Sequence, residues 1–214
     1  GGEKLTSDLL LKFNDWLPEQ NIRISNLYGP TETTVDATIH TFNIDEIQER
    51  DTISIGRPLH HINVWIVDEE GYPLPPNTEG EIVIGGKGIA LGYLNQPELT
   101  AQKFKYNEVL RSLVYHSGDK GFFDQEGKFF IKGRIDNQVK IRGYRIELAD
   151  IEHNLTKING VEEALVLVHS HGEIPKLLAF VTGQKAPLGK LKEKLKRHLP
   201  DYMIPNHIYN LTAF

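Results

Sequence analysis

The most informative stretch of the sequence is Asn26-Leu27-Tyr28-Gly29-Pro30-Thr31-Glu32-Thr33-Thr34, which directly follows an alternating segment, residues 22–27, typical of a β-strand. Ligands of α/β proteins bind beyond the ends of strands. Gly29-Pro30 predicts a sharp turn, after which the loop offers the Thr31 hydroxyl to a phosphate and the Glu32 carboxylate to Mg²⁺, beside the flat ring of Tyr28. A plainer interpretation is a capped turn in which Thr31 to Thr34 opens a helix.

The neighbouring segments indicate a mixed fold. The apolar spacing over residues 5–17 predicts a helix, which ends at Pro18. Alternation over residues 62–66 and 81–84 predicts antiparallel strands, and Asp124-Gln125-Glu126-Gly127 between two apolar runs predicts a hairpin. The front part of the chain is therefore expected to be α/β, with a sheet or a barrel in its middle.

The pattern changes beyond residue 133, where helices and strands mix on a smaller scale. The predicted elements are a hairpin over residues 138–146 around Arg142-Gly143, a helix over 148–158, strands over 164–168 and 176–181, and a helix from Pro187 to Pro200. This order predicts a small α+β unit.

The composition excludes several classes of function. The chain has 214 residues, 39% hydrophobic and 25% charged, so it can bury a globular core. Its net charge of -5 argues against a nucleic-acid or membrane-surface partner. The sequence has no cysteine, which excludes thiol catalysis, and no apolar run near the ~20 residues of a membrane span. The first residues lack the features of a signal peptide, so we expect a cytoplasmic protein.

The charge is distributed unevenly along the chain. Residues 1–135 carry 13 basic and 20 acidic side chains, whereas residues 136–214 carry 11 basic and 9 acidic ones. No Pro- or Ser-rich stretch separates the two parts. The change in charge and pattern predicts two units that meet near Asp136 without a long linker.

Five motifs occur in one order along the chain. They are Tyr28-Gly-Pro-Thr-Glu32, Gly80-Glu-Ile-Val-Ile-Gly-Gly86 with Gly92-Tyr93, Tyr115-His-Ser-Gly-Asp119, Gly133-Arg-Ile-Asp-Asn-Gln-Val-Lys-Ile-Arg-Gly143 and Leu199-Pro-Asp-Tyr-Met-Ile-Pro205. Together they resemble the successive motifs of the amino-acid adenylation domains of nonribosomal peptide synthetases, members of the adenylate-forming enzyme superfamily. The resemblance spans residues 26–205, and a chance occurrence of all five motifs is negligible.

The resemblance implies a division into domains. Residues 1–135 correspond to the C-terminal part of the large adenylation subdomain, with a sheet and a β-barrel part, and residues 136–214 to the small α+β subdomain. The family's phosphate loop is expected upstream of Gly1, in the remainder of the adenylation domain. Its catalytic lysine, in an Asn-Gly-Lys motif, is expected beyond Phe214. We therefore assign no catalytic residue within this chain, and we expect the chain to be inactive on its own.

The resemblance also implies residues that bind the nucleotide and its metal. Tyr28 corresponds to a ring against adenine, and Glu32 to a ligand of Mg²⁺. Asp119 would accept hydrogen bonds from both ribose hydroxyls, a task that suits a carboxylate, and Arg134 would reach the ribose or a phosphate. Ile131 stands where the family usually has an aromatic residue, so it would give only apolar contact. The expected nucleotide-binding residues are Asn26, Tyr28, Gly29, Thr31, Asp119, Ile131 and Arg134.

The amino-acid pocket of the family maps onto Leu27, Val35 and Asp36. A buried carboxylate without a partner is unfavourable, so Asp36 favours a substrate with a small or medium polar side chain. Alternatively, Asp36 caps a helix turn and points away from the pocket. Most of the remaining pocket is expected upstream of Gly1.

Asp136 matches the hinge about which the small subdomain of this family rotates between two half-reactions. Lys140, Arg142 and Gly143 belong to the hairpin that faces the active site during thioester formation. Residues 128–145 contain six basic side chains and one acidic one, which favours a phosphate-bearing ligand.

The reaction implied by the resemblance is the ATP-dependent activation of an amino acid as aminoacyl-adenylate, followed by transfer to the phosphopantetheine thiol of a peptidyl carrier protein. Mg²⁺ would accompany ATP. The alternatives are a related adenylate-forming enzyme, such as an acyl-CoA synthetase, an aryl-acid ligase or a D-alanine ligase, and a noncatalytic fragment that lacks the phosphate loop and the lysine.

Three further patterns indicate less. Gly86-Lys87-Gly88 lacks the Ser or Thr that follows Gly-Lys in a Walker loop, so these glycines predict a bend. His60-His61 and His169-Ser170-His171 offer too few ligands for a zinc site. His116-Ser117 with Asp119 contains the residue types of a catalytic triad, but adjacent residues seldom converge in that geometry.

Overall fold

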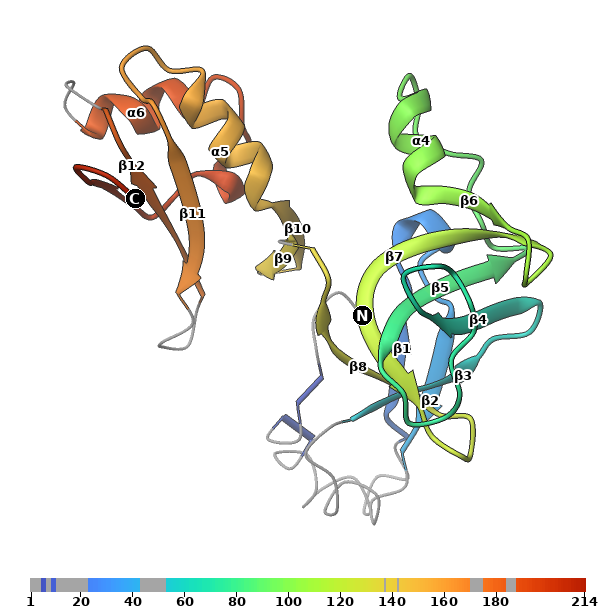
Figure 1. The fold of residues 1–214 in the computed structure, drawn as a ribbon. Coiled ribbons are helices and arrows are strands. Elements are labelled where there is room, and N and C mark those ends of the chain that lie inside the picture. The colour runs from blue at the N-terminus through green and yellow to red at the C-terminus, as the bar shows by residue number, and fades with distance from the viewer. Residues whose placement is uncertain are drawn as a thin grey trace. The chain divides into compact units, whose positions relative to one another are not determined.

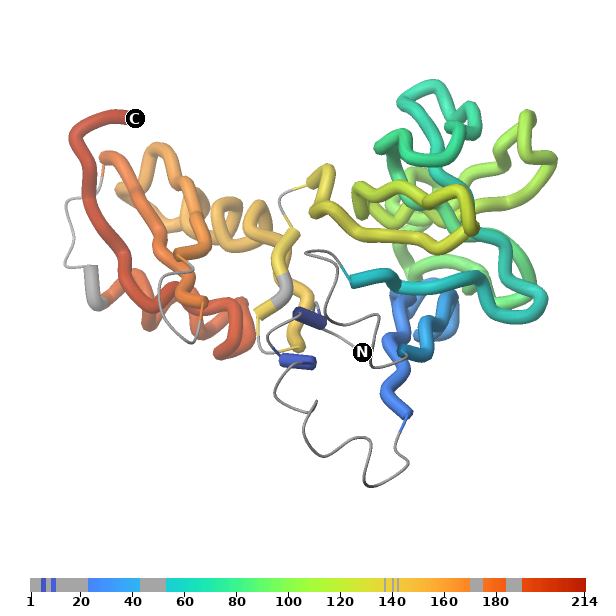
Figure 2. Tube along the Cα trace, turned by 90° about the horizontal axis from the view of Figure 1, so that it is seen from below, coloured from blue at the N-terminus to red at the C-terminus, as the bar shows by residue number. Residues whose placement is uncertain are grey.

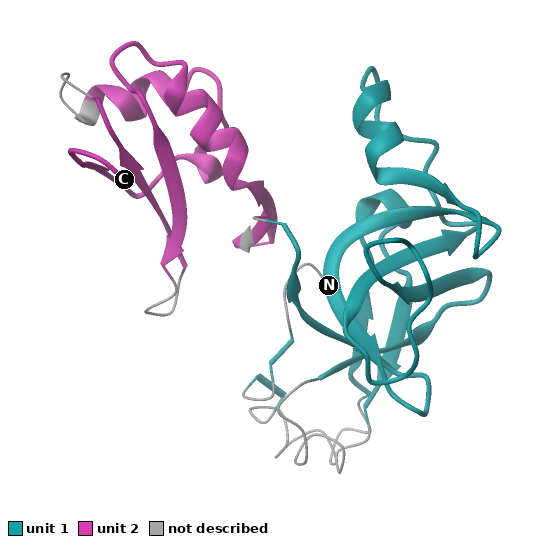
Figure 3. Cartoon of the chain, viewed as in Figure 1, with its two compact units in different colours: residues 1–136 teal, residues 137–214 magenta. Residues whose placement is uncertain are grey.

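The chain forms two compact units, residues 1–136 and 137–214, which Figure 3 colours separately. The computed structural model describes residues 5–6, 9–10, 23–42, 53–136, 138–141, 143–169, 175–183 and 188–214. The helix predicted over residues 5–17 therefore lies almost wholly outside the described residues. The assignment of the two units to a large and a small subdomain stays a prediction.

An antiparallel sheet builds the first unit (Figure 1). Its strands are β1 (Ser25–Tyr28), β2 (Thr38–Thr41), β3 (Ser54–Pro58), β4 (Ile62–Val67), β5 (Gly80–Gly86), β6 (Phe104–Asn107), β7 (Ser112–Phe123) and β8 (Phe129–Arg134). They pair in the order β1-β2-β3-β8-β7-β5-β4, with β6 on β7. Within the described strands, β1 and β4 end this order without pairing to each other, so the expected barrel part is an open sheet.

The views agree with the strand pairing. In Figure 1, β5 and β7 curve side by side through the unit. In Figure 2, the blue hairpin of β1 and β2 lies beside the cyan β3. Helix α4 (Pro97–Lys103) begins at a proline, as helices often do, and leads directly into β6. The mixed α/β class expected from the sequence is confirmed.

The alternation of β4 and β5 explains the core of this unit. Val64, Ile66, Ile82 and Ile84 are buried in one cluster, into which Tyr28 also packs. Burying one such aliphatic side chain contributes ~1.5–3 kcal/mol. The cluster therefore anchors the end of β1, from which the motif loop departs.

The hairpin predicted at residues 124–127 is confirmed between β7 and β8. Oδ1 of Asp124 accepts the N–H groups of Glu126 at 3.0 Å and Lys128 at 2.9 Å. Gly127 has a φ of 76°, which glycine adopts without steric penalty. This tight turn sets the end of β7 against the start of β8.

The second unit is a small α+β fold, as expected. Its elements are β9 (Gln138–Ile141), β10 (Tyr144–Glu147), α5 (Leu148–Thr156), β11 (Ala164–His169), β12 (Lys176–Val181), α6 (Leu188–Leu195), a 3-10 turn (Asp201–Met203) and β13 (His207–Asn210). β12 pairs antiparallel with β11 and parallel with β13. Ile151 and Leu155 of α5 share one core cluster with Leu191 and Leu195 of α6.

Candidate functional site

Tyr28, Asp119 and Arg134, which come from three separate motifs, meet in one hydrogen-bonded group. The Tyr28 hydroxyl donates to Oδ2 of Asp119 at 2.6 Å, and Nη1 of Arg134 donates to Oδ1 at 2.7 Å. Tyr28 and Asp119 are each only 8% exposed. Burial and the neighbouring Asp119 charge raise the pKa of Tyr28 well above its usual value, because both disfavour a phenolate. Each Asp119 oxygen holds one strong donor and retains a further lone pair.

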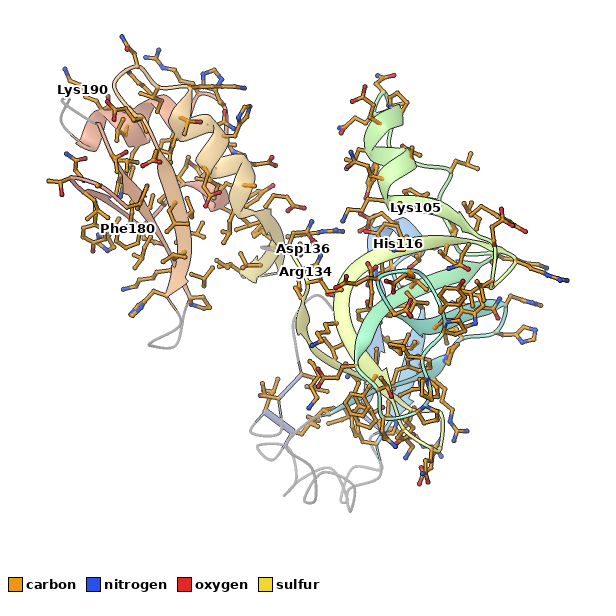
Figure 4. The ribbon with its side chains drawn as sticks, in the orientation of Figure 1. Lys105, His116, Arg134, Asp136, Phe180 and Lys190 are labelled. Carbon is orange, nitrogen blue, oxygen red and sulfur yellow. The ribbon has the colours of Figure 1, made fainter. Side chains whose placement is uncertain are left out.

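Arg134 links this group to Asp136. Its Nε and Nη2 donate to Oδ1 and Oδ2 of Asp136 at 2.6 and 2.8 Å, the two-pronged geometry of strong arginine–carboxylate pairs. Nη2 also donates to the carbonyl of Ser117 at 3.1 Å. Figure 4 shows Arg134 and Asp136 close together where β8 ends. One guanidinium therefore holds two carboxylates, those of Asp119 and Asp136.

The loop after β1 folds back tightly. Thr31–Thr33 forms a 3-10 turn whose N-cap, Pro30, gives no side-chain hydrogen bond, so the turn forms without the cap of the plainer interpretation. A Cβ on Gly29 would lie 2.5 Å from the carbonyl oxygen of Val35, so no larger residue fits. Thr34 and Val35 have φ of 64° and 72°, a strained conformation for a β-branched residue.

Glu32 is held by Tyr93, which ends the second motif, residues 80–93, called the glycine-rich segment below. The Tyr93 hydroxyl donates to Oε1 of Glu32 at 2.7 Å. Burial and this hydrogen bond raise the pKa of Tyr93. The carbonyl of Glu32 accepts the N–H of Ala90 at 2.8 Å, and the Thr34 hydroxyl donates to the carbonyl of Gly88 at 2.7 Å. The glycine-rich segment thus braces the motif loop.

The other residues predicted in this unit differ in exposure. Three of them are half-buried, Leu27, Asp36 and Ile131, and two are exposed, Thr31 and Val35. Nδ2 of Asn26 donates to the carbonyl of Ser54 at 3.0 Å, which ties β1 to β3. Ile131 packs against the core cluster that contains Tyr28. Ile131 therefore packs against the cluster that contains Tyr28, whereas the Asn26 side chain forms a hydrogen bond within the sheet.

The hairpin residues lie in the second unit. Gly143 has a φ of 78° and forms the turn between β9 and β10, while Lys140 pairs in register with Arg145. Nε of Arg145 donates to Oε1 of the buried Gln138 at 2.8 Å. Arg142 lies outside the described residues. The hairpin predicted from the sequence is confirmed, and its part in thioester formation stays a prediction.

Glu81 is a functional candidate that sequence reasoning missed, and its partner is His116, which the sequence suggested only as a residue type of a catalytic triad. Oε2 of Glu81 lies 2.8 Å from Nδ1 of His116, and Oε1 accepts the N–H of Gly118 at 2.9 Å. Figure 4 labels His116 on β7. The available signal was the position of Glu81, a carboxylate that directly precedes three consecutive apolar residues, 82–84, of a strand.

The remaining motifs show other geometry. The Ser117 hydroxyl donates to the carbonyl of Ile82 at 2.6 Å, and His116 contacts Glu81, so these two residues do not form the nucleophile–base pair of a triad. In the part of the chain that the structure describes, no three His, Asp or Glu side chains converge as a metal site. No helix among those residues is long and apolar enough to cross a membrane.

Comparison with known proteins gives the class first. The sequence model of the family described as AMP-binding enzyme matches residues 1–94, the segment that carries Tyr28 and Glu32. The fold and these motifs are thus those of the adenylate-forming enzymes.

Curated relatives and a solved structure narrow the class. Zwittermicin A synthase ZmaJ of Bacillus cereus is 42% identical over 209 residues, 96% of this chain and 39% of that protein. Bacitracin synthase 1 of Bacillus licheniformis is 38% identical over 214 residues, 99% of this chain and 4% of that protein. The structure of PA1221, described as an NRPS protein containing adenylation and PCP domains, matches with a TM-score of 0.82 at 30% identity, covering 100% of this chain and 42% of that one.

These similarities extend over 96% to 100% of this chain, whereas the chain spans 42% or less of the length of each of these relatives. The chain is part of an adenylation domain of the nonribosomal peptide synthetase family.

Proposed function

We propose that the protein containing this chain activates an amino acid with ATP as aminoacyl-adenylate and transfers it to the phosphopantetheine thiol of a carrier protein. The observation that carries the proposal is the convergence of Tyr28, Asp119 and Arg134, 91 and 15 positions apart, at one buried carboxylate. The similarity to PA1221, described as an NRPS protein containing adenylation and PCP domains, supports it. The proposed setting is the cytoplasm.

The chemistry requires no protein nucleophile. A carboxylate oxygen of the amino acid attacks the α-phosphorus of ATP, and the bond to pyrophosphate breaks. The carrier thiol then loses its proton and attacks the acyl carbon, and AMP leaves. Catalysis of this kind depends on positioning and on neutralising charge, which is compatible with a chain that has no cysteine.

Asp119 is the proposed ribose ligand. Its two oxygens are fixed by Tyr28 and Arg134, and a carboxylate has about four lone-pair sites, so it can accept two ribose hydroxyls while keeping both donors. Tyr28 exposes only 8% of its surface, so we propose that it acts through its hydroxyl on Asp119 and offers only a limited ring surface to adenine. Arg134 neutralises the carboxylate and is proposed to donate a hydrogen bond to the ribose or a phosphate.

Glu32 fits the proposed Mg²⁺ ligand. It is a hard oxygen donor fixed by the Tyr93 hydroxyl at 2.7 Å. Magnesium in such sites is bound by one or two carboxylates, together with water and substrate phosphates. Bound there, the ion would neutralise phosphate charge. The exposed Thr31 beside Glu32 is the proposed phosphate donor.

Asp136 is the proposed hinge residue, since it is the last residue of the first unit. Lys140, Arg142 and Gly143 are proposed to act during thioester formation. Leu27, Val35 and Asp36 are proposed to line the amino-acid pocket. The upstream remainder of the adenylation domain and a carrier protein complete the expected partners.

The test is ATP–pyrophosphate exchange by the complete adenylation domain, with wild type compared with Asp119→Ala and the exposed control Glu69→Ala. Loss of a hydrogen bond to a charged group costs ~1.5–3 kcal/mol, so we expect the KM for ATP to rise about 10- to 100-fold in Asp119→Ala. Glu69→Ala should resemble wild type. If no amino acid supports exchange by the wild type, the proposed function is wrong. If the KM for ATP is unchanged in Asp119→Ala, the ribose assignment is wrong.

A further inference from the structure

Asp119 lies in a bulge of β7. β5 and β7 pair Glu81 with Lys120 and Val83 with His116, which leaves Ile82 opposite three residues, 117–119. Bulges re-aim side chains and are common next to active sites. This bulge presents the Asp119 carboxylate to Tyr28 and Arg134. Whatever holds the bulge therefore sets the geometry of the proposed ribose site.

Ser117 holds the bulge from within. Its hydroxyl donates to the carbonyl of Ile82 at 2.6 Å and accepts the N–H of Asp119 at 3.0 Å. Ser117 is only 2% exposed, so water competes little for these bonds. The Asp119 backbone is thereby tied to β5.

Gly118 is held on both of its sides. Its N–H donates to Oε1 of Glu81 at 2.9 Å, and its carbonyl accepts the N–H of Ile135 at 2.8 Å. Gly118 has a φ of 71°, and a Cβ there would lie 2.6 Å from Oδ2 of Asp136 and 2.7 Å from Nη2 of Arg134. The peptide thus spans the space between β5 and the end of β8 with no room for a side chain.

Glu81 supplies the side-chain contact to this peptide from β5. Its second oxygen, Oε2, lies 2.8 Å from Nδ1 of His116, and both side chains are 21% exposed. Burial raises the pKa of Glu81, but hydrogen bonds from His116 and Gly118 outweigh burial, and the pKa lies below its ordinary value. Glu81 is therefore ionised at neutral pH and accepts charge-assisted bonds, which are the stronger kind.

We infer that Glu81 is a positioning residue for nucleotide binding, with His116 as its partner. The pair holds the Gly118 amide and so keeps the 117–119 bulge in the conformation that presents Asp119. The inference rests on the proposed function, in which Asp119 binds the ribose. Glu81 acts through the backbone of the bulge and not by contact with the substrate. Its loss should therefore weaken ATP binding and leave amino-acid binding unchanged.

The kinetic test uses exchange by the complete adenylation domain with Glu81→Ala, Glu81→Gln and His116→Ala. A matched control is Glu79→Ala, which removes an exposed carboxylate that pairs with Lys120 at 2.9 Å. Because Glu81→Ala removes a charged acceptor, we expect the KM for ATP to rise about 10-fold, with kcat and the KM for the amino acid near wild type. Glu81→Gln keeps an acceptor oxygen and should retain most of the affinity. His116→Ala should show a smaller rise, and Glu79→Ala none.

A second measurement does not depend on activity. Amide hydrogen exchange over residues 115–120 should accelerate in Glu81→Ala and not in Glu79→Ala, because the Gly118 N–H loses its acceptor. Thermal unfolding identifies any variant that fails to fold, in which case Glu81→Gln and His116→Ala decide the question.

The outcomes separate this inference from the proposed function. If Asp119→Ala weakens ATP binding while Glu81→Ala has a wild-type KM and wild-type amide exchange, the positioning role is wrong and the ribose assignment stands. An equal loss in Glu81→Ala and Glu79→Ala would also overturn the positioning role, as it would reflect general loss of surface charge. If Asp119→Ala has no effect, the ribose assignment itself falls, and the inference falls with it.

Discussion

The hydroxyl oxygen of Tyr28 lies 2.6 Å from Oδ2 of Asp119, although 91 positions separate the two residues in the chain. β1 stands at one end of the strand order, and β7 is four strands away from it. The bond therefore joins the end of β1 to the bulge of β7. It makes the first and third motifs one structural group.

The first prediction concerns the energy of this bond. Tyr28→Phe keeps the packed ring but removes the donor from a buried carboxylate oxygen. We expect a loss of ~1–3 kcal/mol in the free energy of unfolding, measured by urea denaturation of the adenylation domain. Tyr72→Phe, at a residue 56% exposed, should change it by less than about 0.5 kcal/mol. Equal stability of Tyr28→Phe and wild type would mean that water replaces the hydroxyl at Asp119.

A second prediction concerns alkaline pH. The pKa values of Tyr28 and Tyr93 are raised in the folded protein, by burial first and then by Asp119 and Glu32, respectively. Stability from such a phenol is complete below its unfolded pKa of ~10 and is lost as the pH rises through the folded value. Ultraviolet titration at alkaline pH should therefore show fewer ionised tyrosines in the native protein than in the protein unfolded in urea. Tyr28→Phe should reduce this difference, and an unchanged difference would contradict the assignment.

The strands that the sequence predicts are those that carry a local apolar pattern, such as the alternation of β4 and the continuous apolar run of β12. β3 (Ser54–Pro58) was not predicted, because only Ile55 is a large apolar residue in it. This strand is stabilised by polar bonds to distant elements instead. The Ser54 hydroxyl donates to the carbonyl of Phe129 at 2.9 Å, and the Thr38 hydroxyl donates to the carbonyl of Ile55 at 2.6 Å. Partners so far away in the chain leave no local pattern.

The site divides in a similar way. Tyr28 and Glu32 stand out in the sequence because their residue types suit nucleotide and Mg²⁺ binding, whereas Asp119 and Arg134 are identified through the family motifs that contain them. The role of Glu81 depends on a shift in register between β5 and β7, which places the carboxylate at the Gly118 amide. A bulge is a property of two paired strands, and neither strand alone reveals it.

A third prediction separates backbone strain from crowding at Gly118. Gly118 and Gly127 have similar φ, 71° and 76°, but a Cβ on Gly127 meets nothing within 4 Å. Gly127→Ala should therefore lower the free energy of unfolding only by the ~1–2 kcal/mol that a left-handed conformation costs a non-glycine residue, and it should leave the KM for ATP unchanged. Gly118→Ala should lose more stability and raise the KM, because the Cβ displaces Arg134 or Asp136. Matching effects of the two substitutions would show that crowding is unimportant.

A fourth prediction addresses the proposed hinge. Asp136→Pro fixes φ at the boundary between the units, so thioester formation should slow while pyrophosphate exchange is largely kept. The same change removes the carboxylate that pairs with Arg134 at 2.6 and 2.8 Å. Asp136→Asn is the matched control, because it keeps an acceptor and a free φ. Equal loss in both half-reactions of Asp136→Pro would indicate misfolding instead of a blocked rotation.

The last prediction concerns the amino-acid substrate. Asp36 is half-buried, and among the described residues its carboxylate has no hydrogen-bond or ion-pair partner. The backbone around it is fixed, since its N–H donates to the carbonyl of Thr34 at 2.9 Å and the next N–H, of Ala37, donates to the carbonyl of Tyr28 at 2.7 Å. A partly desolvated carboxylate is best tolerated when the ligand donates a hydrogen bond to it. A hydroxyl or amide side chain would do so, whereas an aliphatic or aromatic one would not.

A panel of amino acids in the exchange assay tests this preference. We expect Ser, Thr, Asn or Gln to be activated with higher kcat/KM than Leu, Val or Phe. Asp36→Leu should reverse the order, because it removes the acceptor and adds apolar surface, while Glu69→Leu at an exposed position should leave it unchanged. Roughly 1–3 kcal/mol of discrimination, about 5- to 150-fold in kcat/KM, corresponds to one such contact. If the wild type already prefers Leu, Val or Phe, Asp36 points away from the substrate and the pocket assignment is wrong.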